Sequence, residues 1–298
     1  MTLNRNTLVR RAATISVNVA VILIIFKLMA WWETDSISLK ASLIDSILDA
    51  TASIINLFAI RQAQQPADKT HRFGYGKSEA LSAVGQSIFV SGSAIWLLLE
   101  IIQRFHTPQN IQETTTGVWV MILSIILTTS LIAFQTYVIK KTNSTAIKAE
   151  SIHYKSDLLI NIAVLFVLIS HEHTNLILID PILGGIISMY ILWTAIKIIR
   201  EALKILMDRE LDNNIRNKIK NIVLSHPKSK GIHDLRTRNS GVNIFIQFHL
   251  ELEGKLTLYD SHDISYEIKK ELIKQFPSAD ILIHKDPEDV KETRQSFL

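Results

Sequence analysis

The first two hundred residues consist of long apolar runs separated by short polar loops, and this pattern restricts the fold more than any other feature. A run of about 20 apolar residues has the length that an α-helix needs to cross the hydrocarbon core of a bilayer. A helix also satisfies its own backbone hydrogen bonds where water is absent. The expected spans are about residues 14–32, 37–60, 79–103, 116–139, 145–170 and 177–199. The sequence therefore predicts an α-helical membrane protein with six transmembrane helices.

The charges of the loops predict the orientation of these helices. Lys and Arg gather at the N-terminus, in the loop 61–78 and in the turn 140–148, whereas the alternate loops contain few of them. Loops rich in Lys and Arg remain on the cytoplasmic side of a membrane. We therefore expect a multi-pass protein with both termini in the cytoplasm.

Two of the apolar runs contain ionisable side chains, four residues apart in each. Asp45 and Asp49 form one pair, and His153 and Asp157 form the other. Residues at i and i+4 lie on the same side of a helix. A charge at the bilayer centre costs at least ~2.5 kcal/mol and needs a partner or a water-filled cavity. Three carboxylates and one imidazole can form a tetrahedral site for Zn²⁺ or a related ion. The alternative is a structural polar network between the two helices.

The composition of the chain excludes some metal ions and some classes of binding partner. The chain has no Cys, which excludes disulfides and thiolate metal sites, and only five Met, which disfavours a soft ion such as Cu(I). The net charge of +4 comes without a basic cluster that is interleaved with aromatic residues, so nothing indicates nucleic-acid binding. We expect divalent metal ions, protons and the lipid bilayer as partners, and no organic cofactor.

From about residue 210 the long apolar runs end and the pattern becomes that of a small soluble domain. An amphipathic helix near 215–222, strands at 232–238, 244–252 and 279–284, and a helix at 261–275 are expected. This α-β-β-α-β order suits a small antiparallel α+β sandwich. The expected domains are 1–209 for transmembrane transport and 210–290 for cytoplasmic metal binding and regulation, followed by a loose tail, 291–298.

Several histidines fall in this C-terminal part. His284 and Asp286 are two residues apart, so they share one face of the last strand, and His249 lies on the polar face of its own strand. Imidazole and carboxylate groups are common zinc ligands. The alternative is a set of surface histidines that happen to cluster.

Short motifs along nearly the whole chain resemble those of the cation diffusion facilitator family, and most closely its bacterial zinc and ferrous-iron efflux branch. They include Asp45-Ser-Ile-Leu-Asp49, Gln65-Pro-Ala-Asp68, Phe73-Gly-Tyr-Gly-Lys77, His153-Tyr-Lys-Ser-Asp157, Leu206-Met-Asp208-Arg209, His233-Asp-Leu-Arg-Thr-Arg238 and His284-Lys-Asp-Pro287. The resemblance implies six transmembrane helices and a ferredoxin-like, metallochaperone-like cytoplasmic domain. It also implies a homodimer in the bacterial inner membrane.

The resemblance further implies functional residues at matching positions. Asp45, Asp49, His153 and Asp157 would form the transport site, and His233, His249, His262, His284 and Asp286 a cytoplasmic two-metal site with Asp286 as the bridge. Asp68 and His71 match a loop site whose third position is here Tyr75, and a phenol is a poor ligand at neutral pH. We therefore expect weak binding at the loop. Lys77 and Asp208 match a charge interlock between the third and sixth helices, and Lys285 stands where Gln is expected.

The activity that the resemblance implies is the export of a divalent metal in exchange for incoming protons. Ligands must lose their protons to coordinate a metal, so one site holds either protons or an ion. Zn²⁺ is the expected cargo, because the Irving–Williams order favours it over Fe²⁺, while Cd²⁺ and Fe²⁺ also suit an Asp₃His set.

Two other functions are weighed against transport. A membrane-bound metal sensor could use the C-terminal domain alone, but it would not need ligands inside the membrane. A membrane metallohydrolase would keep an open position on its zinc, whereas four protein ligands would close the site. The sequence therefore favours a transporter and not an enzyme.

Overall fold

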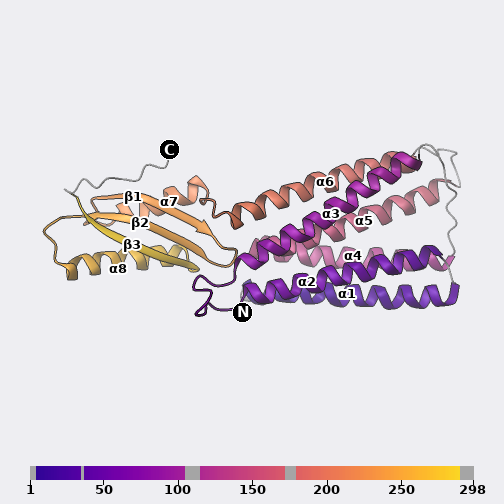
Figure 1. Cartoon of the computed structure of the whole chain (residues 1–298), viewed down its shortest axis with the longest axis horizontal. Helices are drawn as coiled ribbons and strands as arrows, with labels where there is room; N and C mark the ends of the chain where they lie inside the picture. Colours follow the sequence, from indigo (N-terminus) through magenta and orange to yellow (C-terminus); the bar gives the residue numbers. More distant parts are fainter. Residues whose placement is uncertain (1–4, 35–36, 105–114, 172–178, 289–298) are drawn as a thin grey trace. The chain divides into compact units, whose positions relative to one another are not determined.

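The computed structural model describes residues 5–34, 37–104, 115–171 and 179–288, and Figure 1 shows its helices and strands. The chain divides into two compact units, Met1–Leu203 and Lys204–Leu298. Each unit has its own hydrophobic core, so each is considered by itself.

Each of the six apolar runs forms one long helix of the first unit. These are α1 (Arg5–Thr34), α2 (Ile37–Ala63), α3 (Lys77–Arg104), α4 (Thr115–Thr142), α5 (Thr145–His171) and α6 (Ile179–Leu206). The helices are longer than the apolar runs; α1 begins at Arg5 rather than at residue 14 and contains 30 residues. A helix of that length measures about 45 Å, which exceeds the ~30 Å of a hydrocarbon core. The ends of the helices therefore extend past the apolar layer.

Three of these helices have the length and hydropathy of membrane spans within the described residues: Arg5–Glu33, Lys77–Leu99 and Val118–Thr142. Large apolar side chains also point outward on several helices, among them Phe26, Met29, Trp96, Ile126 and Trp193. Exposed apolar surface of this extent suits lipid rather than water. Helices α2, α5 and α6 include residues whose side chains are outside the described part of the chain. That all six helices cross the bilayer stays a prediction.

The helices of the first unit meet in two apolar clusters. One cluster joins α1, α2, α4 and α5 through Leu8, Val9, Ala12, Ala13, Ile60, Val138, Ala146 and Ile147. The other joins α3 to α6 through Val90, Ala94, Ile191 and Ala195. Alanines at the contacts let the helix backbones approach closely, which is how helices pack where lipid removes the hydrophobic driving force.

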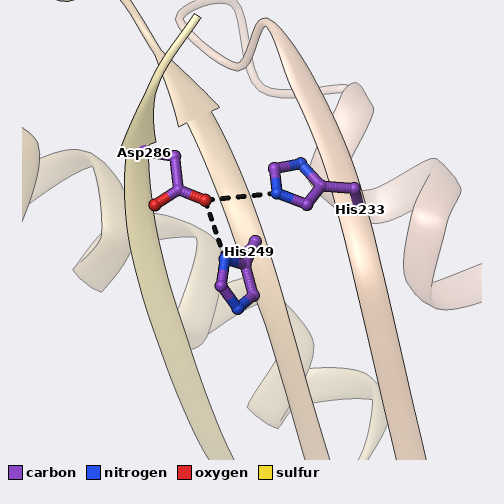
Figure 2. Close-up of side chains that lie close together, drawn as sticks. All are labelled: His233, His249 and Asp286. Atoms are coloured by element: carbon purple, nitrogen blue, oxygen red, sulfur yellow. Dashed lines mark hydrogen bonds and ion pairs between the residues drawn. The ribbon is translucent and has the colours of Figure 1, made fainter. Parts of the chain in front are cut away.

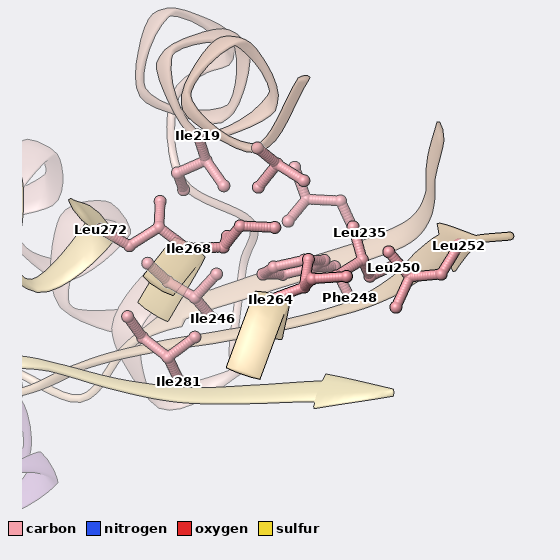
Figure 3. Packing of buried hydrophobic residues seen from close by; sticks show 11 residues of the cluster. Ile219, Leu235, Ile246, Phe248, Leu250, Leu252, Ile264, Ile268, Leu272 and Ile281 are labelled. Atoms are coloured by element: carbon pink, nitrogen blue, oxygen red, sulfur yellow. The ribbon is translucent and has the colours of Figure 1, made fainter. Parts of the chain in front are cut away.

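The second unit is a three-stranded sheet with two helices on one face. Its elements are α7 (Asn213–Leu224), β1 (Gly231–Asn239), β2 (Ile244–Leu252), α8 (Leu258–Gln275) and β3 (Ala279–Pro287), and the strand order is β1-β2-β3. Ile246, Phe248 and Leu250 alternate along β2 and face Ile219 of α7 and Ile268 of α8, as Figure 3 shows. The α+β fold class is confirmed, and the opposite face of the sheet remains free for polar side chains.

The expectation of an antiparallel sheet is wrong for its last strand. β1 and β2 are antiparallel, but β2 and β3 are parallel, with Ile246 paired to Ile281. Parallel neighbours need a crossover connection, and α8 provides it. The order of elements in the sequence was consistent with either direction for β3.

A β-bulge in β1 lets this strand place side chains on both faces of the sheet where they are needed, Leu235 in the core and His233 on the polar face. The register with β2 shifts between His233 and Arg236, and Asp234 has a left-handed φ of 47°. In a regular strand, His233 and Leu235 would point to the same side. The extra residue sends Leu235 into the core and leaves His233 on the polar face beside His249.

The strained backbone at Asp234 predicts how this strand responds to substitution. A β-branched side chain in the left-handed region costs ~1–2 kcal/mol, whereas Gly adopts it freely. We expect Asp234→Val to lower the free energy of unfolding of the C-terminal unit by about that amount, and Asp234→Gly to leave it unchanged or raised. Urea unfolding of residues 204–298 measures both; equal effects of Val and Gly would contradict the role of the bulge.

Candidate metal centres

The first candidate centre lies between α2 and α5. His153 Nε2 is 2.8 Å from Asp49 Oδ1 and 3.9 Å from Asp157 Oδ2, and one ligand atom from each of the three residues lies within 4.8 Å of the others. The three side chains are mostly buried, with exposed fractions of 12%, 15% and 29% for His153, Asp49 and Asp157. The structure therefore joins the two pairs that the sequence placed on separate helices.

The fourth expected ligand, Asp45, lies on α2 one turn before Asp49, but its side chain is outside the described residues. Around it, Lys27 of α1 donates to Ser46 Oγ at 2.6 Å and to the Ser42 carbonyl oxygen at 3.2 Å. This contact fixes α1 against the same stretch of α2. An aromatic ring, Phe89 of α3, meets the His153 imidazole edge-on with centroids 6.0 Å apart.

The second candidate centre is built by the register of the three strands. His233, His249 and His284 are paired across β1, β2 and β3, so they form one row on the polar face of the sheet. Gly231, Glu251 and Asp286 form the adjacent row on the same face.

Asp286 connects the histidines of this centre. Its Oδ2 atom is 2.7 Å from His249 Nδ1 and 3.2 Å from His233 Nε2, as Figure 2 shows, and its Oδ1 atom is 3.0 Å from His284 Nε2. The Asp286 side chain is only 5% exposed. One ligand atom each of His233, His249 and Asp286 lies within 4.8 Å of the others, which is a donor set for one zinc-like ion, and His284 lies beside the second oxygen of Asp286.

Two residues of this centre were not expected from the sequence. Glu251 Oε1 is 2.7 Å from His233 Nδ1, so Glu251 orients the imidazole whose Nε2 atom faces Asp286. Gly231 makes room for this carboxylate, because a Cβ atom at position 231 would lie 2.2 Å from Glu251 Oε2. The only signal in the sequence was that Glu251 follows His249 by two residues on the same strand face.

The structure separates His262 and Lys285 from the cluster. His262 is exposed on α8, which covers the opposite, apolar face of the sheet, and it belongs to neither group of ligand atoms found among the described residues. Alternation along β3 directs Lys285 toward the face opposite His284 and Asp286. A ligand role for His262 in this centre would therefore need a second copy of the chain.

The loop between α2 and α3 is held by hydrogen bonds to Asp68. Its Oδ1 atom accepts from the backbone N–H groups of His71 and Thr70 at 2.7 and 2.8 Å, and the Tyr75 hydroxyl donates to Oδ2 at 2.7 Å. These donors, the His71 backbone first, hold the pKa of Asp68 well below its usual range, and Asp68 in turn raises the pKa of Tyr75. Tyr75 thus acts as a donor to Asp68, and His71 Nδ1 lies 3.9 Å from Asp68 Oδ1.

Asp208 of the expected charge interlock has a partner within its own unit. Its Oδ2 atom lies 3.3 Å from Arg238 Nη1, and its φ of 54° ends α6 in the left-handed region. Lys77 belongs to the other unit. The pairing of Lys77 with Asp208 therefore stays a prediction.

The chain joins a bundle of long apolar helices to an α+β unit, and each of the two contains a cluster of His and Asp side chains. This combination defines a membrane protein that binds divalent metal ions. Residues 13–207 match the family of cation efflux transmembrane domains, and residues 211–288 match the cytoplasmic domain of cation efflux proteins.

Individual relatives give the same result over nearly the whole chain. The cation-efflux pump FieF of Yersinia enterocolitica is 44% identical over 280 residues, which cover 94% of this chain and 93% of that protein. The pump of the same name from Pectobacterium carotovorum is 41% identical with the same coverage. The solved metal-bound C-terminal domain of the CzcD transporter from Thermotoga maritima is 26% identical, with a TM-score of 0.26, over 28% of this chain and 100% of that chain.

The chain belongs to the cation diffusion facilitator family. It is a membrane transporter that acts in metal cation efflux and not an enzyme.

The contact between Glu251 and His233 predicts an effect on metal affinity. Partners that orient a ligating histidine are typically worth 10–100-fold in metal affinity. We expect Glu251→Gln to weaken zinc binding to the C-terminal centre by about tenfold or more, and Gly231→Ala to weaken it as well by displacing Glu251. Calorimetric titration with Zn²⁺ measures the change, and Glu253→Gln, at an exposed position past the end of β2, is the control. Unchanged affinity in both variants would contradict the orienting role.

Proposed function

We propose that this protein exports Zn²⁺ from the cytoplasm in exchange for protons, and that Cd²⁺ and Fe²⁺ are further cargoes. The proposal rests on the positions of Asp49, His153 and Asp157 between two apolar helices. One ligand atom from each of these residues lies within 4.8 Å of the others. Ionisable groups at such positions in membrane helices typically mark ion pathways. Asp45, one helical turn from Asp49, completes a tetrahedral ligand set in this proposal.

The chemistry of the ligands supports the coupling to protons. The imidazole titrates near neutral pH, and carboxylates that share a small site repel one another when both are charged. His153 Nε2 lies 2.8 Å from Asp49 Oδ1, a distance at which a protonated imidazole and a carboxylate can pair. An arriving metal must displace the protons from this set, so metal binding and proton release are coupled at the ligands.

Zn²⁺ is proposed as the first cargo on chemical grounds. The ligands are hard or borderline oxygen and nitrogen donors, and the chain has no Cys for softer ions. Zn²⁺ accepts a tetrahedral arrangement of such donors without a preference from its d electrons.

Two ion pairs suggest how access to this site changes. Arg5 of α1 pairs with Glu79 of α3 at 3.3 Å, and Lys148 of α5 pairs with Glu201 of α6. Both pairs, named here the inner ion pairs, join the apolar cluster of α1, α2, α4 and α5 to helices α3 and α6. They also lie at the helix ends that face the basic loops, so in the proposed orientation they hold the cytoplasmic side closed. Rocking of one helix group against the other would break them.

The C-terminal unit is proposed as a cytoplasmic regulatory domain that binds Zn²⁺ and joins two copies of the chain. In the proposed homodimer, His262 would reach the two-metal centre of the other copy, and Lys77 and Asp208 would form a charge interlock between the third and sixth helices. The proposed boundaries are 1–209, 210–290 and a tail, 291–298; the protein would span the inner membrane six times, with both termini in the cytoplasm. The Asp68–His71 loop is at most a weak additional site.

The main rival is a membrane-bound sensor that binds metal without moving it. The C-terminal centre suits both functions, but a sensor gains nothing from a ligand set between α2 and α5. A metallohydrolase would need an open metal position and a free general base.

Flux measurements distinguish these functions. We expect Zn²⁺ uptake into proteoliposomes that depends on a transmembrane pH gradient and that falls at least ~100-fold in Asp157→Ala, because one of the few ligands is lost. Asp280→Ala, at an exposed position of β3, should behave like the wild type. Zinc binding without flux under any gradient would overturn transport in favour of the sensor.

The inner ion pairs predict a change in access to the site. A partly exposed pair is worth ~0–1 kcal/mol, so Glu201→Gln should raise cytoplasmic exposure of the site by up to about fivefold. Because the chain lacks Cys, the labelling rate of a single Ser53→Cys reporter by an impermeant reagent in inside-out vesicles measures this exposure. Glu33→Gln, at the opposite end of α1, is the control. The swap Lys148→Glu with Glu201→Lys should restore the rate; no restoration would contradict the pairing.

A further inference from the structure

Glu150 of α5 is a fully buried carboxyl group that the transport ligands do not include. The residue is 1% exposed and lies one helical turn before His153. It is surrounded by α1, α2 and α4 as well as by its own helix, since Ser16, Asn56 and Gln135 face it. A position this deep in an apolar bundle needs an explanation, because ionisable groups there are costly and functional.

The hydrogen bonds of Glu150 fit a carboxylic acid better than a carboxylate. Ser16 Oγ lies 3.1 Å from both Glu150 Oε2 and the Ala12 carbonyl oxygen, and its single hydrogen can serve only one of them. Gln135 Nε2 is 3.0 Å from Ser16 Oγ but 3.4 Å from Glu150 Oε2. If Glu150 is protonated on Oε2, it donates to Ser16 Oγ, Ser16 donates to Ala12, and Gln135 donates to Ser16. Each of the hydrogens in this chain then has an acceptor, and Ser16 Oγ both accepts and donates.

The charged groups around Glu150 also favour a protonated carboxyl group. Among the described residues, no Lys, Arg or His nitrogen lies within 4.0 Å of its carboxyl oxygens, and Oε1 has no hydrogen-bond partner. The groups that face it from α1 and α4 are the neutral Ser16 and Gln135. From α5 it interacts with His153 and Tyr154, and Tyr154 interacts in turn with Asp49 and Asp157. An unpaired buried carboxyl group takes up a proton rather than remain charged.

A chain of polar groups connects this carboxyl group with the transport site. Tyr154 follows His153 in α5, and its hydroxyl is 2.9 Å from Ser53 Oγ. Ser53 is one helical turn from Asp49 in α2 and also faces Glu150. Both Ser53 and Glu150 lie on the side of the site that faces the basic loops, which the proposed orientation places toward the cytoplasm.

We propose that Glu150 is a separate proton-binding site, which holds a proton in the resting protein and passes protons from the transport ligands to the cytoplasm. In each transfer, the resident proton leaves the carboxyl group of Glu150 for cytoplasmic water, and a proton from His153 or Asp49 replaces it through the hydroxyl groups of Tyr154 and Ser53. This role in proton exchange rests on the proposed function; the protonated state of Glu150 does not.

Infrared spectroscopy tests the protonated state directly. The wild-type protein in membranes should show the carbonyl band of a protonated carboxylic acid at neutral pH, and Glu150→Gln should remove it while Glu253→Gln leaves it. Gln fills the same space, and its side-chain N–H can donate to Ser16 Oγ as the protonated carboxyl group does, so a purely structural role would tolerate this change. Glu150→Asp keeps the acid and should shift the band rather than abolish it. Protonated transport aspartates would contribute to the spectra of both proteins, so the test is the difference between them, and identical carbonyl bands in the wild type and Glu150→Gln would overturn the proposal.

Transport by the same variants tests the role in exchange. We expect Glu150→Gln to bind Zn²⁺ as the wild type does and to retain zinc–zinc exchange, while its uptake driven by a pH gradient falls roughly 100-fold, the lower end of the range for loss of a proton-transfer group. Gradient-driven uptake equal to that of the wild type would overturn the relay, as would zinc affinity that falls with the carboxyl group, since Glu150 would then be a metal ligand. If the wild type itself shows no gradient-driven flux, the proposed antiport fails, while the infrared band still decides whether Glu150 is protonated.

Discussion

A carboxylate or imidazole inside an apolar helix has no water around it, and this desolvation cost governs how the helical unit is assembled. Among the described residues, several polar side chains of these helices have a partner on a neighbouring helix. His153 of α5 meets Asp49 of α2, and Lys27 of α1 meets Ser46 of α2. Glu150 of α5 meets Ser16 of α1 and Gln135 of α4. The polar contacts thus specify which helices are neighbours in a bundle where apolar packing against lipid or protein discriminates little.

The two metal centres use different means to hold their ligands. In the helical unit, the ligands come from two separate helices, and their distances change whenever one helix moves against the other. In the C-terminal unit, the histidines of β1, β2 and β3 are fixed by backbone hydrogen bonds between adjacent strands. The first arrangement suits an ion that must enter and leave, and the second suits an ion that remains bound.

Much of this architecture could be predicted from the sequence, because the spacing of apolar residues differs between helices and strands. The six helices and the alternation along β2 are examples. The meeting of Asp49 with His153 could only be anticipated, because the spacing of residues within one helix does not determine which helices pack together. The direction of β3 and the bulge at Asp234 were missed, since a crossover helix fits either direction and one extra residue leaves the composition of a strand unchanged. Glu251 and Glu150 resemble ordinary polar residues until their partners are known.

The C-terminal centre also joins distant parts of the chain. His233 and Asp286 are 53 residues apart in sequence (286 minus 233), so an ion bound to both acts as a removable cross-link across the domain. Because the site does not exist in the unfolded chain, an ion bound there stabilises the folded domain by mass action. Binding of the metal and folding of the domain are then thermodynamically coupled. A shortage of the ion would then leave this unit less stable against unfolding.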